Sequence, residues 1–421
     1  MNTRTPIVEY KDVTGARFLN VNFNQDYTCF SCSSQTGFLI YNADPLDCKL
    51  SKQFSNANAC GIGLTCMLYR TNYLALVGGG RRPKYPQNKL VVWDDLQQTE
   101  SITLGFMSQI QDIFLSRVNI IVVLDSAIEI YTFGSKPRRL VSLLDTCAGA
   151  SADFVVCQSP RRRSSSANAP AGSDATVMRG ILAFPSGRNP GQVQIADLSH
   201  LQSSEIQEDT SVQLPTSIIK AHKTPIRRIK LSPNGNMVAT CSVQGTIVRI
   251  FSTQNGTLLK ELRRGLDRAD IYEMAWSLRG NRLAVVSDKQ TLHIFQISDD
   301  DGDNKNKTHM LKDVPLLWKP KYLASTWSMC SRHLDSAVRG KNDINDKAFN
   351  NDRCKIGWCH DGEEDSLVLV WRDSGIWEKY VMLERENKVY TVSESLPTGS
   401  PPQSGAPKKR WEVVRASWRQ L

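Results

Sequence analysis

A short strand followed by a turn, repeated from end to end, is the feature of this sequence that most restricts its fold. From Phe18 onward, runs of about four to eight residues rich in Val, Ile, Phe and Tyr are separated by Gly, Asn, Asp, Ser or Pro. No long stretch shows the period of about 3.6 residues that marks an amphipathic helix. The pattern therefore predicts an all-β fold.

The strands also repeat as groups. They come in threes and fours with a period of about 40–45 residues, which is the period of propeller blades. The clearest internal match aligns Asn236–Phe251 (NMVATCSVQGTIVRIF) with Asn281–Phe295 (NRLAVVSDKQTLHIF). One residue is deleted in the second copy, so the matched polar pairs are Ser242 with Ser287, Thr246 with Thr291, and Arg249 with His293.

This grouping predicts one seven-bladed, WD-repeat-like β-propeller over residues 1–421. A β-sandwich, or two separate β domains, is the alternative all-β fold. The last blade is the least regular. The blades are expected near residues 18–54, 60–106, 110–146, 153–223, 225–264, 270–330 and 355–420.

Four segments interrupt the strand pattern. Residues 159–174 are rich in Arg, Ser, Ala and Pro and are predicted to be a disordered loop. Residues 298–320 form a long loop within blade six, acidic at its start and apolar at its end. Residues 332–353 are a polar insertion, and residues 394–409 are a flexible segment that leads into the last strand. Long loops in a compact repeat fold are often functional or disordered.

Composition excludes several classes of protein. The sequence is 40% hydrophobic and 22% charged, which is typical of a globular chain. Its start has no apolar segment like that of a signal peptide, and no stretch approaches the roughly 18 apolar residues of a membrane helix. Eleven cysteines at irregular spacing are typical of reduced thiols. We therefore expect a soluble, cytoplasmic protein.

Positive charge is concentrated in one part of the chain. There are 52 Lys and Arg against 42 Asp and Glu, a formal net charge of +10. Between Lys220 and His293 there are 13 basic and 5 acidic residues, so this stretch contributes 13 − 5 = +8. Such a local excess indicates an anionic partner, whether lipid headgroups, nucleic acid or an acidic protein.

The motif Leu262-Arg263-Arg264-Gly265 (LRRG) lies at the centre of the basic stretch, at the predicted end of the outer strand of blade five. Successive side chains on a strand point to opposite faces, so the two arginines are expected to serve two different clefts. Guanidinium groups and hydroxyls suit phosphate oxygens. Cleft one is predicted to consist of His222, Ser242, Thr246, Arg249 and Arg263. Cleft two is predicted to consist of Arg264, Ser287, Thr291 and His293.

LRRG and its surroundings resemble the PROPPINs, β-propellers that bind polyphosphoinositides in autophagy and endosomal traffic. The resemblance covers nearly the whole chain, and Leu262, where the family motif also has Phe, favours the LRRG subgroup. The insertions in blade four and after Arg332, and the basic, aromatic C-terminus, depart from the family pattern. The matching segments are HKTPI at 222–226, LSPNG at 231–235, ATCSVQGTIVRIF at 239–251, DRADIYEMAWS at 267–277, SDKQTLHIF at 287–295, GGGRRPKYPQNKLVVWDD at 78–95 and KYLASTWSMC at 321–330.

The resemblance implies a seven-bladed propeller without the usual shared-strand closure. It implies two headgroup sites, for phosphatidylinositol 3-phosphate and the 3,5-bisphosphate, and clefts one and two fall on the matching positions. It also implies that the loop at 298–320 enters the bilayer, which we assign to Met310, Leu311 and Val314.

The resemblance further implies a protein partner. In the family the blade-two loop recruits a large lipid-transfer protein of autophagy, and here that loop contains Arg81, Arg82 and Pro83. We therefore expect a monomeric adaptor that is peripheral on pre-autophagosomal, endosomal and vacuolar membranes.

No set of nucleophile, base and orienting residue stands out, so the sequence predicts a non-enzyme without a cofactor or metal. Cys29 and Cys32 have the spacing of a metal or redox pair, but residues three apart on a strand face opposite ways. Two other functions remain open, a protein-interaction scaffold and a propeller that binds RNA phosphate. The basic clefts lack interleaved aromatic residues for base stacking, which argues against nucleic acid.

Overall fold

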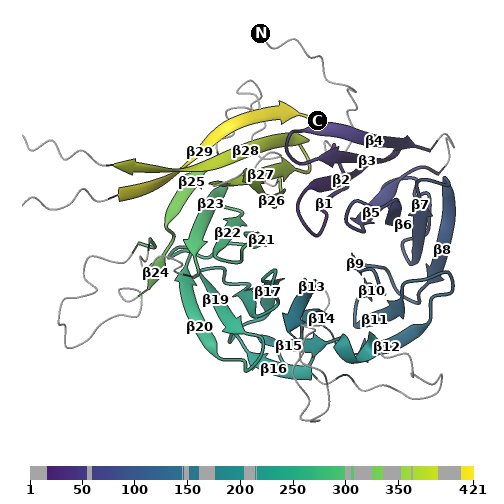
Figure 1. Ribbon diagram of the computed structural model, residues 1–421, viewed down its shortest axis with the longest axis horizontal. Helices are drawn as coiled ribbons and strands as arrows, with labels where there is room; N and C mark the ends of the chain where they lie inside the picture. Colours follow the sequence, from purple (N-terminus) through teal and green to yellow (C-terminus); the bar gives the residue numbers. More distant parts are fainter. Residues whose placement is uncertain are drawn as a thin grey trace, which may run out of the picture.

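The computed structural model describes residues 17–54, 59–144, 146, 151–160, 176–202, 214, 216–298, 305–307, 325–334, 352–361, 364–386 and 409–421. Within these residues seven sheets stand in a ring (Figure 1), which confirms the predicted seven-bladed β-propeller. The described part of the chain contains no helix long and apolar enough to cross a membrane.

The blades follow one another in chain order, and each begins with its innermost strand (Figure 1). Blades one and two are β1 (Asn20–Phe23), β2 (Cys29–Ser33), β3 (Gly37–Asn42), β4 (Asp47–Gln53) and β5 (Ile62–Met67), β6 (Tyr73–Gly78), β7 (Lys89–Asp94), β8 (Thr99–Gly105). Blade three is β9 (Asp112–Leu115), β10 (Asn119–Val123), β11 (Ala127–Thr132) and β12 (Arg139–Leu144). Blade four is β13 (Asp153–Pro160), β14 (Thr176–Pro185), β15 (Gln192–Asp197) and β16 (Thr216–Lys220), with the 3-10 turn η1 (Ser199–Gln202).

The remaining blades carry the basic stretch and the C-terminus. Blade five is β17 (Ile226–Leu231), β18 (Met237–Ser242), β19 (Ile247–Ser252) and β20 (Leu258–Arg263), with β24 (Thr326–Trp327) added. Blade six is β21 (Ile271–Trp276), β22 (Arg282–Ser287), β23 (Thr291–Gln296) and β25 (Cys330–His333). Blade seven is β26 (Cys354–Asp361), β27 (Glu364–Trp371), β28 (Ile376–Glu386) and β29 (Lys409–Gln420).

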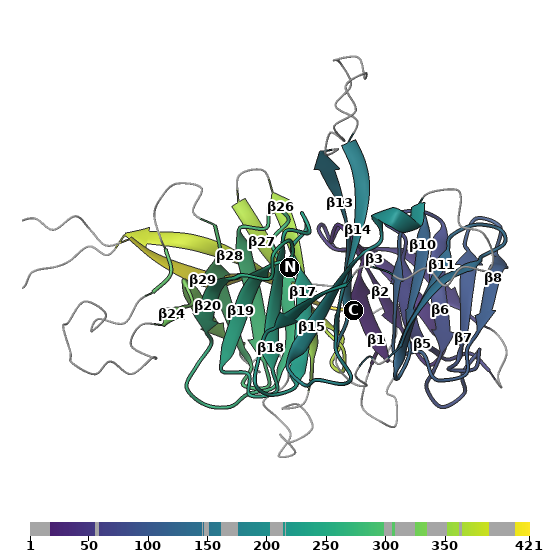
Figure 2. The same ribbon diagram turned by 90° about the horizontal axis from the view of Figure 1, so that it is seen from below.

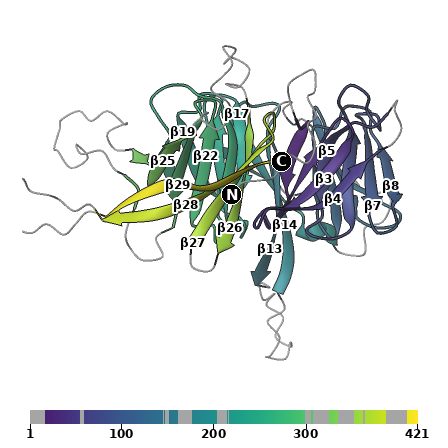
Figure 3. The same cartoon turned by 90° about the horizontal axis from the view of Figure 1, so that it is seen from above.

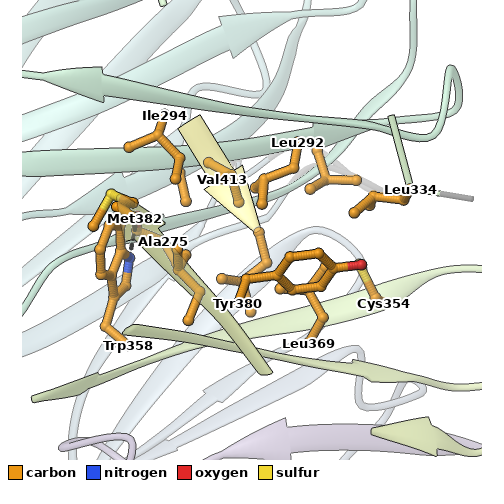
Figure 4. Packing of buried hydrophobic residues seen from close by; sticks show 14 of the residues in the cluster. Ala275, Leu292, Ile294, Leu334, Cys354, Trp358, Leu369, Tyr380, Met382 and Val413 are labelled. Carbon is orange, nitrogen blue, oxygen red and sulfur yellow. Dashed lines mark hydrogen bonds between the residues drawn. The ribbon is translucent and has the colours of Figure 1, made fainter. Parts of the chain in front are cut away.

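The hydrophobic core lies between neighbouring blades. All five residues of β10 are buried, whereas most of the outer strand β4 is exposed. An inner strand is buried on both faces because its sheet packs between two others, and such strands read as continuous apolar runs. Figure 4 shows one core layer, between blades six and seven, where Trp358 and Tyr380 pack with Met382. The Trp358 indole also donates a 3.0 Å hydrogen bond to the Ala275 carbonyl oxygen.

The ring closes by packing between blades one and seven. Blade seven takes its four strands from one continuous C-terminal stretch, and no strand of the described residues is shared between the two blades. The Phe18 N–H donates to the Arg372 carbonyl oxygen at 3.1 Å, and the Trp377 indole donates to the Ala43 carbonyl oxygen at 3.0 Å. Closure therefore depends on side-by-side contact, as the family resemblance implied.

We expect Trp377→Ala to weaken this closure strongly. Trp377 is 3% exposed, and truncation of a buried tryptophan typically lowers the free energy of unfolding by about 3–5 kcal/mol. Trp418, on the adjacent strand β29, is 43% exposed, so Trp418→Ala is a matched control with an expected effect under about 1 kcal/mol. Urea unfolding followed by circular dichroism measures both losses. Equal losses in the two variants would mean that Trp377 does not hold the ring together.

The outer edge of blade six differs from the sequence prediction. The predicted blade ended at residue 330, whereas its fourth strand, β25, begins there and pairs with β23. The residues just before it form β24, which pairs in parallel with β20 as a fifth strand of blade five (Figure 1). The LRRG strand is therefore covered by a further strand and is not the outermost one.

Several predicted loop boundaries also fall elsewhere. Ser159 and Pro160 belong to β13, Arg332 and His333 belong to β25, and Lys409 begins β29. Strands pair up to these residues because each continues the ladder of its neighbour. Figures 2 and 3 show β13 and β14 projecting out of the plane of the ring. The rest of segments 159–174 and 394–409, and most of 298–320 and 332–353, lie outside the described residues.

Candidate functional site

The two arginines of LRRG lie on opposite faces of blade five. Leu262 packs with Trp276 in the core layer between blades five and six. Because side chains alternate along a strand, Arg263 faces blade four and Arg264 follows on the side of blade six. The strand register supports this placement of Arg263. Glu261 lies two residues before Arg263 and therefore on the same face, and it pairs with Arg249.

Arg249 of cleft one is already held by two acceptors. Its Nε donates to Glu261 Oε2 at 2.9 Å, and its Nη1 donates to the Ala221 carbonyl oxygen, which precedes blade five, at 2.7 Å. The second bond places Arg249 at the junction of blades four and five. Because Glu261 offsets part of this positive charge, an anion in cleft one must compete with a carboxylate for Arg249.

Arg263 and His222 are the other strong hydrogen-bonding groups of cleft one. Arg263 Nε donates to Ser325 Oγ at 2.8 Å. His222, in the connection between β16 and β17, lies with its Nε2 3.0 Å from Thr240 Oγ1. Ser242 ends β18 and is buried. The structure thus brings an arginine and a histidine to the blade-four side of blade five.

Cleft two is built around Arg264, which is only 7% exposed. Its Nε donates to the Gly245 carbonyl oxygen at 2.7 Å, and its Nη2 donates to the Asp267 carbonyl oxygen. Both acceptors are uncharged, so the guanidinium keeps its positive charge while its position is fixed. His293 lies with its Nδ1 3.3 Å from Ser328 Oγ. The remaining predicted members are the fully buried Ser287 and the half-buried Thr291.

Both cleft histidines are neutral at pH 7. Burial lowers the pKa of His222 to about 4, and the charge of Arg249 adds to the effect. Burial also lowers the pKa of His293 to about 4, with further contributions from Arg264 and Lys307. Because the charge of Arg264 contributes to the lowered pKa of His293, these two residues interact electrostatically. Each predicted cleft therefore pairs a charged arginine with a neutral imidazole.

Anion binding in the clefts is expected to take up protons. A phosphate beside an imidazole favours its charged form and raises its pKa. Between that raised pKa and about 4, the complex holds more protons than the free protein, so the histidine contribution to affinity rises as the pH falls through this window. Calorimetry of a short-chain phosphatidylinositol 3-phosphate in two buffers of different ionisation enthalpy counts these protons. The variant His222→Gln with His293→Gln should take up fewer, and uptake equal to wild type would contradict the assignment.

The repeat that relates the clefts holds at most positions. Arg249 pairs with Thr240 in blade five, and His293 pairs with Val285 in blade six. Arg249 and His293 therefore occupy equivalent positions, as the sequence alignment predicted. Thr246 departs from the alignment, because Ile247 is the register counterpart of Thr291. The reason is a turn that is one residue longer in blade five than in blade six.

Glycine is required in the longer turn. Gly245 has a φ of +61°, and a Cβ there would lie 1.8 Å from the Ala269 carbonyl oxygen. The structure places Thr246 just before β19, where its carbonyl oxygen accepts a 3.0 Å hydrogen bond from the Arg264 N–H. Its place in cleft one stays a prediction.

Sequence reasoning missed the segment that contributes Ser325 and Ser328. These serines are 8% and 7% exposed and contact Arg263 and His293, one residue of each predicted cleft. The sequence STWS after the long loop is the only indication of this segment, and its pattern predicts an ordinary strand of blade six. Only the three-dimensional pairing of β24 with β20 places it beside LRRG.

The predicted partner loop in blade two has a fixed backbone and exposed tips. Arg81, Arg82 and Pro83 are exposed. The Arg81 N–H donates to Gln35 Oε1 at 2.9 Å, and the Arg82 carbonyl oxygen accepts from the Gly61 N–H at 2.8 Å. A rigid loop loses little conformational entropy when it docks.

Two cavities line the central opening of the ring, and they contain both lysines and carboxylates. Lys230 Nζ donates to Asp153 Oδ1 at 2.8 Å, and Lys355 Nζ donates to Glu273 Oε2 at 3.1 Å. This mixture of signs does not suit an anion. The described residues contain no cluster of His, Cys, Asp or Glu that could hold a metal, and Cys29 and Cys32 lie in different core layers.

Comparison with known proteins identifies the family of this chain. The PROPPIN family model matches residues 18–310. The chain is 49% identical to SVP1-like protein 2 of Saccharomyces cerevisiae and 48% identical to SVP1-like protein 2 of Eremothecium gossypii, with 100% of both chains covered in each comparison. Among solved structures, Hsv2 of Kluyveromyces lactis is similar with a TM-score of 0.65 and 28% identity, covering 96% of this chain and 99% of that one. The chain therefore belongs to the PROPPIN family, non-enzymatic β-propellers that bind phosphoinositides at membrane surfaces as adaptors in autophagy.

Proposed function

We propose that this protein binds phosphatidylinositol 3-phosphate and the 3,5-bisphosphate through clefts one and two, one headgroup in each. The observation that carries the proposal is the placement of Arg263 and Arg264 on opposite faces of one strand end. Each arginine lies on the same side as a neutral histidine, and charge-assisted hydrogen bonds of guanidinium to phosphate are strong. Membranes of the pre-autophagosome, the endosome and the vacuole carry such lipids and are the proposed sites of action.

The loop at 298–320 is proposed to provide the apolar anchor. Met310, Leu311 and Val314 lie outside the described residues, so the proposal depends on their sequence and on the base of the loop. At that base Asn306 is 6% exposed and exchanges two hydrogen bonds with the backbone of Gln296, at 2.9 and 2.7 Å. The base of the loop is therefore fixed next to cleft two. Apolar residues flanked by lysines are typical of interfacial anchors.

The blade-two loop is proposed to bind the large lipid-transfer protein of autophagy. Replacing Arg81, Arg82 and Pro83 by Ala should weaken the pull-down of that partner about tenfold or more, since charged contacts in a preformed loop each contribute about 1–2 kcal/mol. Vesicle binding should stay at the wild-type level, because the loop belongs to blade two and the clefts to blades five and six. Equal recovery of the partner by wild type and variant would remove this loop from the interface.

Vesicle sedimentation tests the proposed function against its alternatives. The protein should sediment with vesicles that contain phosphatidylinositol 3-phosphate and remain in solution with vesicles of equal charge made with phosphatidylserine. It should not retard a single-stranded RNA at the same salt concentration. Equal binding to both kinds of vesicle would point to a nonspecific basic surface, and RNA binding would favour the nucleic-acid alternative. Binding to none of the three would favour a scaffold that acts through proteins alone.

A further inference from the structure

The segment Ser325–Ser328 is unusual because it touches both clefts. It follows directly on the long loop of blade six and is held at several points. Thr326 and Trp327 pair with the LRRG strand as β24. The Trp327 N–H donates at 2.9 Å to the carbonyl oxygen of Lys307, at the other end of the loop. The chain then enters blade six, where the Met329 N–H donates to the Ile294 carbonyl oxygen at 2.9 Å.

Ser325 fixes the guanidinium of Arg263. In a parallel pair, residues in register have their side chains on the same face, so Trp327 and Ser325, two residues apart, both lie on the face of Arg263. Arg263 Nε donates to Ser325 Oγ at 2.8 Å. This bond sets the plane of the guanidinium, and the donors on its two Nη atoms have no hydrogen-bond partner among the described residues. They form the fork that suits two oxygens of one phosphate.

Ser328 fixes the imidazole of His293 in cleft two, as Ser325 fixes the guanidinium of Arg263 in cleft one. Its Oγ lies 3.3 Å from His293 Nδ1, and the imidazole also stacks on Phe295 with ring centroids 6.3 Å apart. When the serine hydroxyl donates to Nδ1, the proton of the neutral ring resides on Nε2. Nε2 is then a donor directed away from the segment, which is the role that a phosphate oxygen in cleft two requires.

We infer that Ser325 and Ser328 are positioning residues, one for each headgroup cleft, and that the segment between them sets the geometry of both clefts at once. The inference rests on the proposed function, because it assigns roles at the same two clefts. Both serines are more than nine-tenths buried, so they act on the ligand through Arg263 and His293. Since Lys307 and Trp327 join the two ends of the loop, the loop leaves the propeller at the point where the clefts are organised.

Single-cleft backgrounds test this inference. In protein carrying Arg264→Thr, which leaves cleft one, Ser325→Ala should weaken calorimetric binding of short-chain phosphatidylinositol 3-phosphate about three- to tenfold, the effect of one lost hydrogen bond. Ser328→Ala should leave that binding unchanged. In protein carrying Arg263→Thr, only cleft two remains. Ser328→Ala should then weaken binding by the same factor, and Ser325→Ala should leave it unchanged. Ser325→Thr keeps the hydroxyl and should restore binding in cleft one.

Trp327→Phe is the control for a general effect of the segment. It alters the residue between the serines, and its indole Nε1 is buried without a hydrogen-bond partner in the described structure, so binding in both clefts should persist. Two results would overturn the inference, provided that the arginine variants still lose binding. One is equal weakening of both clefts by either serine variant, and the other is unchanged binding in every serine variant. Unchanged binding in the arginine variants would instead overturn the proposed function.

Discussion

Replacing Arg263 and Arg264 together by Thr is expected to abolish sedimentation with phosphatidylinositol 3-phosphate vesicles. Each arginine would lose a charge-assisted phosphate contact of about 1.5–3 kcal/mol, so the double change should weaken binding by orders of magnitude. Arg264 also holds the carbonyl oxygens of Gly245 and Asp267. A modest fall in melting temperature is therefore expected, with the β-sheet circular dichroism retained.

Arg268→Thr is the matched control for this experiment. Arg268 is exposed and lies, like Arg264, in the connection between β20 and β21, so its replacement removes one positive charge and none of the predicted cleft residues. It should reduce vesicle binding only slightly, because exposed charges are screened by salt. If the folded double variant sedimented like wild type, the headgroup assignment of LRRG would be wrong. If Arg268→Thr were as damaging as the double change, net charge and not the clefts would govern binding.

The second large effect is expected for the loop at 298–320, the proposed apolar anchor. Met310→Asp with Leu311→Asp should reduce vesicle binding strongly and leave calorimetric binding of a short-chain soluble headgroup lipid nearly unchanged. Insertion of two apolar side chains contributes about 1.5–3 kcal/mol each, and a carboxylate at the acyl boundary reverses the sign of that contribution.

Two exposed apolar residues elsewhere provide the control. Leu96 and Met107 are fully or largely exposed and lie next to β8 of blade two, away from the clefts of blades five and six. Leu96→Asp with Met107→Asp adds the same charge and should leave vesicle binding intact. If the loop variant lost soluble headgroup binding as strongly as vesicle binding, the loop would shape the cleft rather than enter the membrane.

The sequence was sufficient to predict the seven-bladed propeller, because the same group of short strands and turns recurs along the chain. Alternation along β20 also predicts that Arg263 and Arg264 face different neighbours, and the packing of Leu262 in the layer next to blade six agrees with it. Local periodicity of this kind is the part of a fold that a single sequence expresses most directly.

Long-range pairing is what the sequence did not reveal. A strand pattern at 321–333 fits the edge of blade five as well as that of blade six, and the chain uses both, with β24 on one and β25 on the other. The acceptors of Arg249 and Arg264 include the carbonyl oxygens of Ala221 and Gly245, and a backbone acceptor leaves no mark on residue type. The one-residue difference in turn length likewise shifted Thr246 out of register with Thr291.

The number of headgroups bound per chain tests the central claim most directly. Calorimetric titration with short-chain phosphatidylinositol 3-phosphate should give two equivalents per chain in the wild-type protein. Arg263→Thr and Arg264→Thr should each leave one equivalent, because each change removes the arginine of a single cleft. The double variant should bind none. One equivalent in the wild type, or two in both single variants, would contradict the account in which the strand end at LRRG serves two separate clefts.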